Sequence, residues 1–311
     1  MDQVINFTDM PVNRYKMYGG KSCKKFCITI DDLDYMLKFP PKRKRNIEMG
    51  YTHACACEYI GSKIFAYFGI ETQQTLLGTY GNNIAVACKD FETDGFRFIK
   101  FAALKNITVS NSNGGYDTDL HDILNTIRSQ ELYPSVELES FFWEMFVVDA
   151  YIGNFNRHNE SWGFLLNDDT KEVKLAPVFN CDSSLYPGLV EDTIVDILNS
   201  REEINRRLYE FPISATKIND EKLSYSAFLL TTDNTSCIDA IIKIGVIDTN
   251  RINAIIEKTP LITNAHKAFL KFMLKERKKQ VINPALNRAI SLQKNKIPAA
   301  ELSNDGNDFT V

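Results

Sequence analysis

The chain of 311 residues contains 44% hydrophobic and 24% charged residues and has a formal net charge of -4 at pH 7. This balance is typical of a globular protein with one large domain or two modest ones, and the net charge does not favour a nucleic-acid partner. No apolar run is long enough for a membrane span, and residues 1–11 lack the pattern of a signal peptide. We therefore expect a cytoplasmic protein with no membrane partner, although secretion without a signal peptide stays open.

The first third of the chain is predicted to be rich in strands. Apolar and β-branched residues bounded by turn residues predict strands, and apolar residues at helical spacing before Gly69 predict one helix. The predicted strands are 26–31, 35–39, 72–79 and 84–91, and the helix covers about 49–68. The pattern indicates a small β-rich lobe with one helix over residues 1–91.

From residue 92 onward helical periodicity dominates. The segment 137–152 is apolar on most faces, which predicts a buried central helix that ends at Gly153. A polar loop and two short strands, 162–166 and 173–177, follow it. Further helices are predicted at 117–128, 191–199, 202–209, 237–244, 250–258 and 265–280. The fold class is therefore α+β, with a larger helical lobe over 92–295 and a polar tail, 296–311, that we expect to be disordered.

The order of lobes, loop and hairpin is that of protein kinases, and several short strings carry a closer resemblance. The strings are YMLKFP at 35–40, EY at 58–59, ACKDF at 87–91, GNFNRHN at 153–159 and APVFNC at 176–181. In this order they resemble the lysine strand, small-lobe helix, hinge, catalytic loop and metal loop of the HipA-like serine/threonine kinases. The short, CtkA-type members are the most similar, and the resemblance runs from about Gly19 to about Leu292.

The resemblance implies a site for ATP. Its residues would be Gly19, Gly20, Lys38, Glu58, Lys89 and Phe91. Lys38 would contact the α- and β-phosphates and pair with Glu58, unless the two form an ordinary surface pair. The two glycines would let backbone N–H groups approach phosphate, or they form a plain turn. Phe91 lies in the implied hinge or is simply core, and the resemblance offers Ser22 as an autophosphorylation site.

The positions that would transfer phosphate depart from the family pattern. Asn156 stands where the resemblance expects the catalytic Asp, Ser161 where it expects a metal-binding Asn, and Asn180 where it expects the metal-binding Asp. An amide cannot act as a general base, and loss of one typically lowers the rate about 10²–10⁴-fold. Mg²⁺ is usually held by carboxylates, so its ligands are depleted.

We therefore predict a pseudokinase that acts by binding a nucleotide or a protein partner. The alternative is an active serine/threonine kinase in which Asp182, two residues after Asn180, supplies a displaced metal ligand. A different transfer reaction, such as nucleotidylation, has no direct support in the residues.

The remaining motifs have structural interpretations. The seven cysteines are odd in number and scattered, which favours reduced core thiols. Cys55 and Cys57 form a C-x-C motif near His53, but without a second ligand pair this is weak evidence for zinc. The basic run 42–45 is expected to be a solvated loop, and His158 to be structural.

Overall fold

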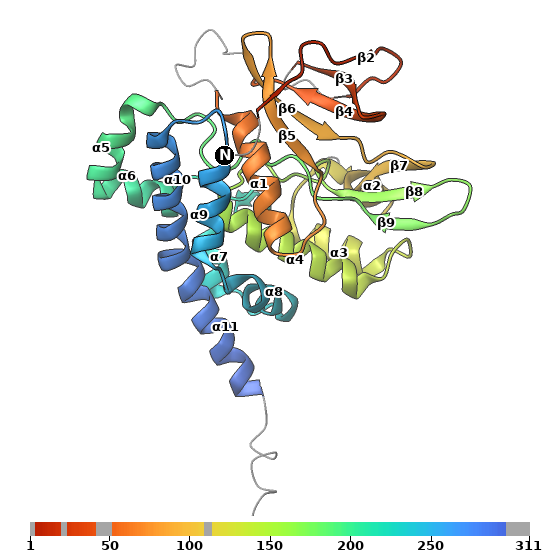
Figure 1. Cartoon of the computed structure of the whole chain (residues 1–311). Helices are drawn as coiled ribbons and strands as arrows, with labels where there is room; N and C mark the ends of the chain where they lie inside the picture. Colours follow the sequence, from red (N-terminus) through yellow and green to blue (C-terminus); the bar gives the residue numbers. More distant parts are fainter. Residues whose placement is uncertain (1–3, 20–23, 42–51, 109–113, 297–311) are drawn as a thin grey trace, which may run out of the picture.

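The structure, a computed structural model, describes residues 4–19, 24–41, 52–108 and 114–296 (Figure 1). Gly20, Ser22, the basic run 42–45 and the tail 297–311 lie outside the described residues, so the predictions made for them are not tested. Within the described ranges, no helix has both the length and the apolar character that crossing a membrane requires.

A mixed sheet of six strands forms the N-terminal part, in the order β1-β5-β6-β4-β3-β2. The strands are β1 (Ile5–Asn6), β2 (Val12–Asn13), β3 (Lys25–Ile30), β4 (Leu33–Lys38), β5 (Thr75–Tyr80) and β6 (Asn83–Lys89). Asp31 and Asp32 have φ angles of 48° and 61° in the β3–β4 turn, a conformation that Asp tolerates better than most residues. Because β4 pairs with β3 on one side and β6 on the other, its last residue, Lys38, lies inside the sheet.

The helix α1 (Ala54–Tyr67) packs against β5 and β6 and is buried around most of its circumference. Its C-terminal end is marked by Gly69, which has a φ of 75°, a value that glycine adopts without strain. At Gly61 an added Cβ would lie 2.5 Å from the Cβ of Cys181. Glycine therefore lets α1 approach the segment around Cys181 closely.

The C-terminal part contains a small sheet and most of the helices. Its sheet has the order β7-β8-β9, from β7 (Phe96–Lys100), β8 (Gly163–Asn167) and β9 (Val173–Leu175). The helices are α2 (Phe101–Thr108), α3 (Leu120–Ser129), α4 (Ser135–Ile152), α5 (Ile194–Asn199), α6 (Arg201–Asn205), α7 (Tyr225–Thr231), α8 (Thr235–Gly245), α9 (Thr249–Lys258), α10 (Asn264–Arg277) and α11 (Asn283–Lys296). Short elements join them: η1 (Gly114–Tyr116), η2 (Glu191–Thr193), the π turns η3 (Arg206–Glu210) and η4 (Lys278–Ile282), and the hairpin β10 (Lys217–Ile218) and β11 (Glu221–Lys222).

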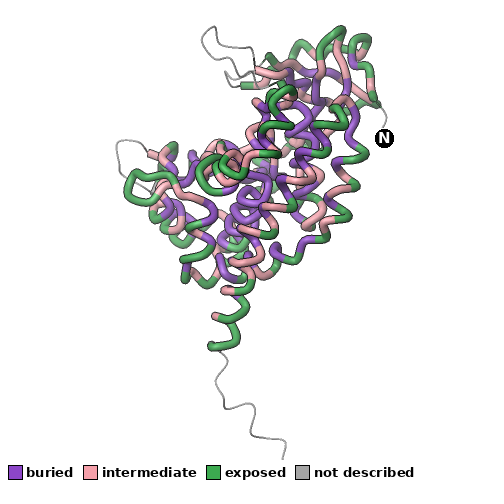
Figure 2. The backbone as a smooth tube through the Cα atoms, turned by 90° about the vertical axis from the view of Figure 1, so that its left-hand side faces the viewer, coloured by how far each residue is buried: buried purple, intermediate pink, exposed green. Residues whose placement is uncertain are grey.

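The main hydrophobic core surrounds α4 and extends upward to α1, so the two parts share one core. A second, smaller core covers the sheet around Phe7, Ile28 and Leu37. Burial is concentrated along these inner elements, whereas the last turns of α11 extend from the body and are exposed (Figure 2). The predicted central helix is therefore confirmed, and it ends as predicted at Gly153, where φ is 67°.

Several elements differ from the sequence predictions. The strand β7 and the helices α2, α7 and α11 were not predicted, and the helix predicted at 265–280 continues beyond its expected end. Pro284 follows the expected end, and a proline lacks an N–H and normally interrupts a helix. Here the π turn η4 precedes it and lets the chain continue as α11. The proposed lobe boundary at 91/92 stays a prediction.

Candidate active site

Lys38 lies among oxygen atoms from other segments. Its Nζ is 2.9 Å from Oε2 of Glu58 and 3.2 Å from Oδ2 of Asp182, and it donates to Oδ1 of Asn180 at 3.5 Å. The side chains of Lys38 and Glu58 are 9% and 0% exposed, so they form a buried contact between β4 and α1 and not a surface pair. Burial alone would lower the pKa of Lys38, but Asp182 and Glu58 hold that pKa well above its ordinary value. Lys38 is therefore a fixed cation.

Glu58 also binds the loop that contains Asn180. Its Oε1 accepts hydrogen bonds from the backbone N–H groups of Asn180 at 2.9 Å and Cys181 at 3.2 Å. Its Oε2 accepts the N–H of Asp182 at 3.1 Å. One carboxylate on α1 thus fixes both the lysine and this loop, with charge-assisted bonds that are stronger than neutral ones.

Asn180 and Ser161 are bonded to each other. The amide nitrogen of Asn180 donates to Oγ of Ser161 at 3.1 Å, while the amide oxygen faces Lys38. This orientation follows from the neighbours, because a lysine can only donate and a hydroxyl can accept. Asn180 has a φ of 64°, which asparagine adopts more readily than most residues.

Asp182 brings a carboxylate to the same loop as Asn180, but this carboxylate is paired with Lys38. Burial raises the pKa of Asp182, whereas the charge and hydrogen bond of Lys38 lower it, and the net result is a lowered pKa. A Mg²⁺ ion normally needs carboxylate oxygens. Because Asn180 and Ser161 are neutral and satisfy one another, the residues present do not fit the usual kinase metal site.

The loop after α4 is organised by a buried ion pair. Nε and Nη2 of Arg157 donate to the two oxygens of Asp149 at 2.8 and 3.2 Å. Nη1 donates to the backbone oxygen of Ser161 at 3.2 Å and also to that of Phe179. Arg157 therefore connects the loop to the residue before Asn180. The sequence analysis missed this role, although a lone Asp in the apolar segment 137–152 was a signal that a cation must lie nearby.

Asn156 is exposed in this loop, and its backbone N–H donates to Oδ1 of Asn154 at 3.1 Å. Both ring nitrogens of His158 lie 3.3 Å from Oγ of Ser161. Burial lowers the pKa of His158, so the ring is neutral near pH 7. This contact agrees with the structural role predicted for His158.

Lys89 and Phe91, at the ends of the implied hinge, contact neighbouring segments of the protein. The N–H of Lys89 donates to the backbone oxygen of Gln74 at 2.8 Å, and its carbonyl accepts from Nε2 of Gln73 at 2.9 Å. Phe91 packs against Phe98 and Phe179, with ring centroids 5.7 and 5.5 Å away. These contacts are those of a packing residue, and a role in nucleotide binding stays a prediction for both positions.

The segment before Gly19 is held by an unexpected residue, Asp90. Its Oδ2 accepts a hydrogen bond from the hydroxyl of Tyr18 at 2.6 Å and lies 2.6 Å from Nζ of Lys16. At Gly19 itself an added Cβ would meet no atom of the described residues within 4 Å. The sequence analysis did not identify the contact with Asp90, because the partners lie more than 70 residues apart.

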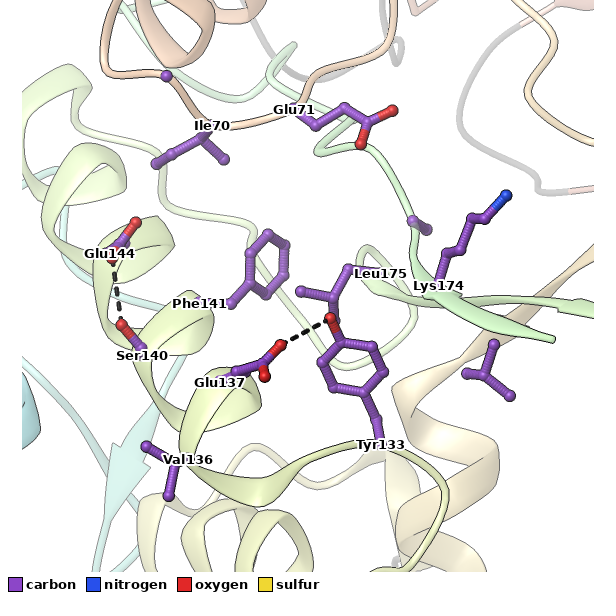
Figure 3. Close-up of a pocket in the computed structure, with 13 residues that line it drawn as sticks. Ile70, Glu71, Tyr133, Val136, Glu137, Ser140, Phe141, Glu144, Lys174 and Leu175 are labelled. Atoms are coloured by element: carbon purple, nitrogen blue, oxygen red, sulfur yellow. Dashed lines mark hydrogen bonds between the residues drawn. The ribbon is translucent and has the colours of Figure 1, made fainter.

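A surface pocket of about 630 Å³ lies elsewhere, among the start of α4, the segment after α1 and β9 (Figure 3). Phe141 and Leu175 contribute apolar surface. The hydroxyl of Tyr133 bonds to Glu137 at its edge. None of the candidate site residues named above lines this pocket.

No family model matches the chain, but comparison with individual proteins is decisive. The chain is 43% identical over 290 residues to serine/threonine-protein kinase CtkA of Helicobacter pylori strain J99, which covers 93% of this chain and 89% of the relative. The chain belongs to the HipA-like serine/threonine kinases of the CtkA type. The predicted family is thus confirmed.

Solved structures support the same assignment. The crystal structure of the Helicobacter pylori proinflammatory kinase CtkA matches with a TM-score of 0.89 and 42% identity, over 93% of this chain and 99% of that one. HipA of Shewanella oneidensis MR-1, solved with HipB and operator DNA, matches with a TM-score of 0.55 and 12% identity, over 89% and 70% of the two chains. The latter supports the fold alone. The bilobal, kinase-like α+β fold of the CtkA type is therefore confirmed.

Proposed function

We propose that this CtkA-type chain is a pseudokinase, which binds ATP but transfers its γ-phosphate weakly or not at all. The observation that carries the proposal is the neutral pair formed by Asn180 and Ser161 beside Lys38. The lysine that would contact phosphate has its partners, whereas the two positions for metal ligands offer no charge. We therefore expect ATP as the ligand, and we expect its binding not to depend on a Mg²⁺ ion held by Asn180 and Ser161.

The residues divide into those suited to binding and those unsuited to chemistry. Lys38, held by Glu58, can neutralise phosphate charge where the surroundings exclude water. Asn156 is exposed at the position where a substrate hydroxyl would give up its proton, but an amide has no basicity to accept it. If the protein acts by binding, its expected partner is a protein that docks on the nucleotide-bound form. We expect this binding to take place in the cytoplasm.

Transfer of label from γ-labelled ATP, with Mg²⁺ or Mn²⁺, tests the proposal. The protein is compared with a variant that carries Asn156→Asp, Ser161→Asn and Asn180→Asp together, and calorimetry measures ATP binding by both. We expect both proteins to bind ATP and only the restored variant to label itself or a generic protein substrate. Efficient labelling by the unaltered chain would overturn the proposal, as would failure to bind ATP.

One observation favours the alternative, an active kinase with a displaced metal ligand. The carboxylate of Asp182 lies beside Asn180 and within 3.2 Å of Lys38, so the loop does bring an acid to the site. If the unaltered chain labels a substrate, Asp182→Ala should abolish labelling. Unchanged activity in that variant would rule out this mechanism.

A further inference from the structure

Three potential metal ligands meet outside the candidate active site. They are His53 at the N-terminal end of α1, Glu191 at the start of η2 and His266 in the first turn of α10. One ligand atom from each lies within 4.8 Å of the others. The residues are far apart in the sequence, so the fold alone brings them together.

His266 is the unusual member of this cluster. The residue is 0% exposed, and within the described part of the chain neither ring nitrogen has a hydrogen-bond partner. A buried polar group without a partner costs about 1–3 kcal/mol, so native proteins rarely leave one. Its ring packs against that of His53, with centroids 4.2 Å apart and the planes at 62°. The unpaired nitrogens of His266 therefore lie beside a second imidazole and a carboxylate.

We propose that His53, His266 and Glu191 bind a divalent transition-metal ion of the Zn²⁺ class. Two imidazoles and one carboxylate are a common donor set for Zn²⁺, with water as the fourth ligand. Harder ions such as Mg²⁺ and Ca²⁺ prefer sites made of oxygen alone. Zinc–ligand bonds of about 2.0–2.2 Å place neighbouring donors roughly 3.4 Å apart, so small side-chain rotations close the site.

The surroundings of the two histidines suit this role. The backbone N–H of His53 donates to the backbone oxygen of Pro187 at 3.1 Å, which holds the N-terminal end of α1 against the segment that leads to Glu191. His266 is buried and His53 is partly buried, and burial disfavours the charged imidazolium, so each ring can offer a lone pair to a metal ion.

The site would join α1 to the helical part of the protein. His53 lies five residues before Glu58, the residue that holds Lys38 and the loop with Asn180. Glu191 and His266 belong to η2 and α10, in the helical part of the protein. There α9 lies between α1 and α10 and contacts both (Figure 1). A metal ion bound here would fix the N-terminal end of α1 and, through it, the position of Glu58.

The neighbouring C-x-C motif takes no part. Sγ of Cys55 bonds to the backbone oxygen of Lys38, and Sγ of Cys57 to that of Leu185. The six cysteines among the described residues are buried and form no disulfide, as predicted. His53 thus belongs to a candidate metal site, but with partners that no local spacing could reveal.

Zinc binding to the full chain tests the site. The protein is stripped with a chelator, dialysed and titrated with Zn²⁺ in competition with a chromogenic chelator, and Co²⁺ provides a visible spectrum of the coordination. We expect one equivalent to bind, and His53→Gln and Glu191→Gln each to weaken binding more than about 100-fold, since loss of an outer partner alone costs about 10–100-fold. Thermal unfolding should show a rise in Tm with Zn²⁺ that these variants lack.

Two matched controls make the result specific. His121→Gln removes an exposed histidine on α3, and Asp192→Asn removes the exposed acid next to Glu191. Both should bind Zn²⁺ like the unaltered protein. Because His266 is buried, partly exposed Glu191 is the deciding position. Absence of binding by the unaltered chain, or equal affinity of Glu191→Gln and Asp192→Asn, would overturn the proposal, whatever the phosphotransfer assay shows.

Discussion

Replacement of Arg157 by alanine should destabilise the protein strongly, because its partner Asp149 would be left buried without its counter-ion and two of its hydrogen-bond donors. Asp149 is 1% exposed and Arg157 is 7% exposed. Removing one partner of a buried ion pair costs about 3–5 kcal/mol. The backbone oxygens of Ser161 and Phe179 would also lose their donor. With roughly 2–4 °C per kcal/mol for a large domain, Tm should fall by about 6–20 °C.

Thermal and urea unfolding followed by circular dichroism would measure this loss. Arg97→Ala is the matched control, because Arg97 pairs with Asp168 while their side chains are 50% and 54% exposed. An exposed pair contributes at most about 1 kcal/mol. The double variant Asp149→Leu, Arg157→Met should recover part of the loss, since it leaves no uncompensated charge. If Arg157→Ala costs no more than Arg97→Ala, the buried pair does not organise the loop as argued.

Three further predictions follow from contacts of α1 and the loop at 180–182. Gly61→Val should lower stability by about 1–3 kcal/mol and weaken ATP binding, because its Cβ would lie 2.5 Å from that of Cys181. An unchanged Tm and an unchanged affinity for ATP in melting and calorimetric assays would contradict this close approach. Lys38→Met should weaken ATP binding by about 10–100-fold in calorimetry, the effect of one charged hydrogen bond; unchanged affinity would remove Lys38 from the site. The pKa of Asp182 is lowered from 3.8, so its contribution to stability is complete above that pH and is lost as pH falls through the lowered value. The difference in urea midpoint between the protein and Asp182→Asn should therefore shrink on acidification below about pH 3.8, and a constant difference would contradict the ion pair.

The central elements of the fold could be predicted because their signals are local. The apolar faces of α4 require burial, and the turn at Asp31 and Asp32 separates β3 from β4 within a few residues. By contrast, β7 passes into α2 between Lys100 and Phe101 with no glycine or proline to mark the change. The two elements are told apart only by pairing with β8, which comes some 60 residues later.

The candidate site could also be predicted in part, because some of its signals are local in the sequence. The substitutions at Asn156, Ser161 and Asn180 are visible in the sequence, as is the proximity of Asp182. Their consequences are not, because the bond between Asn180 and Ser161 depends on how two loops approach each other. The same holds for the contact of Asp90 with Tyr18, which joins segments 72 residues apart.

Glu58 explains why nucleotide binding and phosphate transfer should be separable in this protein. Both of its oxygens are used, by Lys38 and by three backbone N–H groups of the loop that contains Asn180. A movement of α1 that broke the pair of Glu58 with Lys38 would therefore also release the loop at 180–182. Lys38 and this loop are thus held in place together. This network contains no contribution from the side chain of Asn156, and it needs no acid at position 180 because the loop is held by its backbone. If the proposed function is correct, the contacts that would bind phosphate do not depend on the side chains proposed to have lost their role in chemistry.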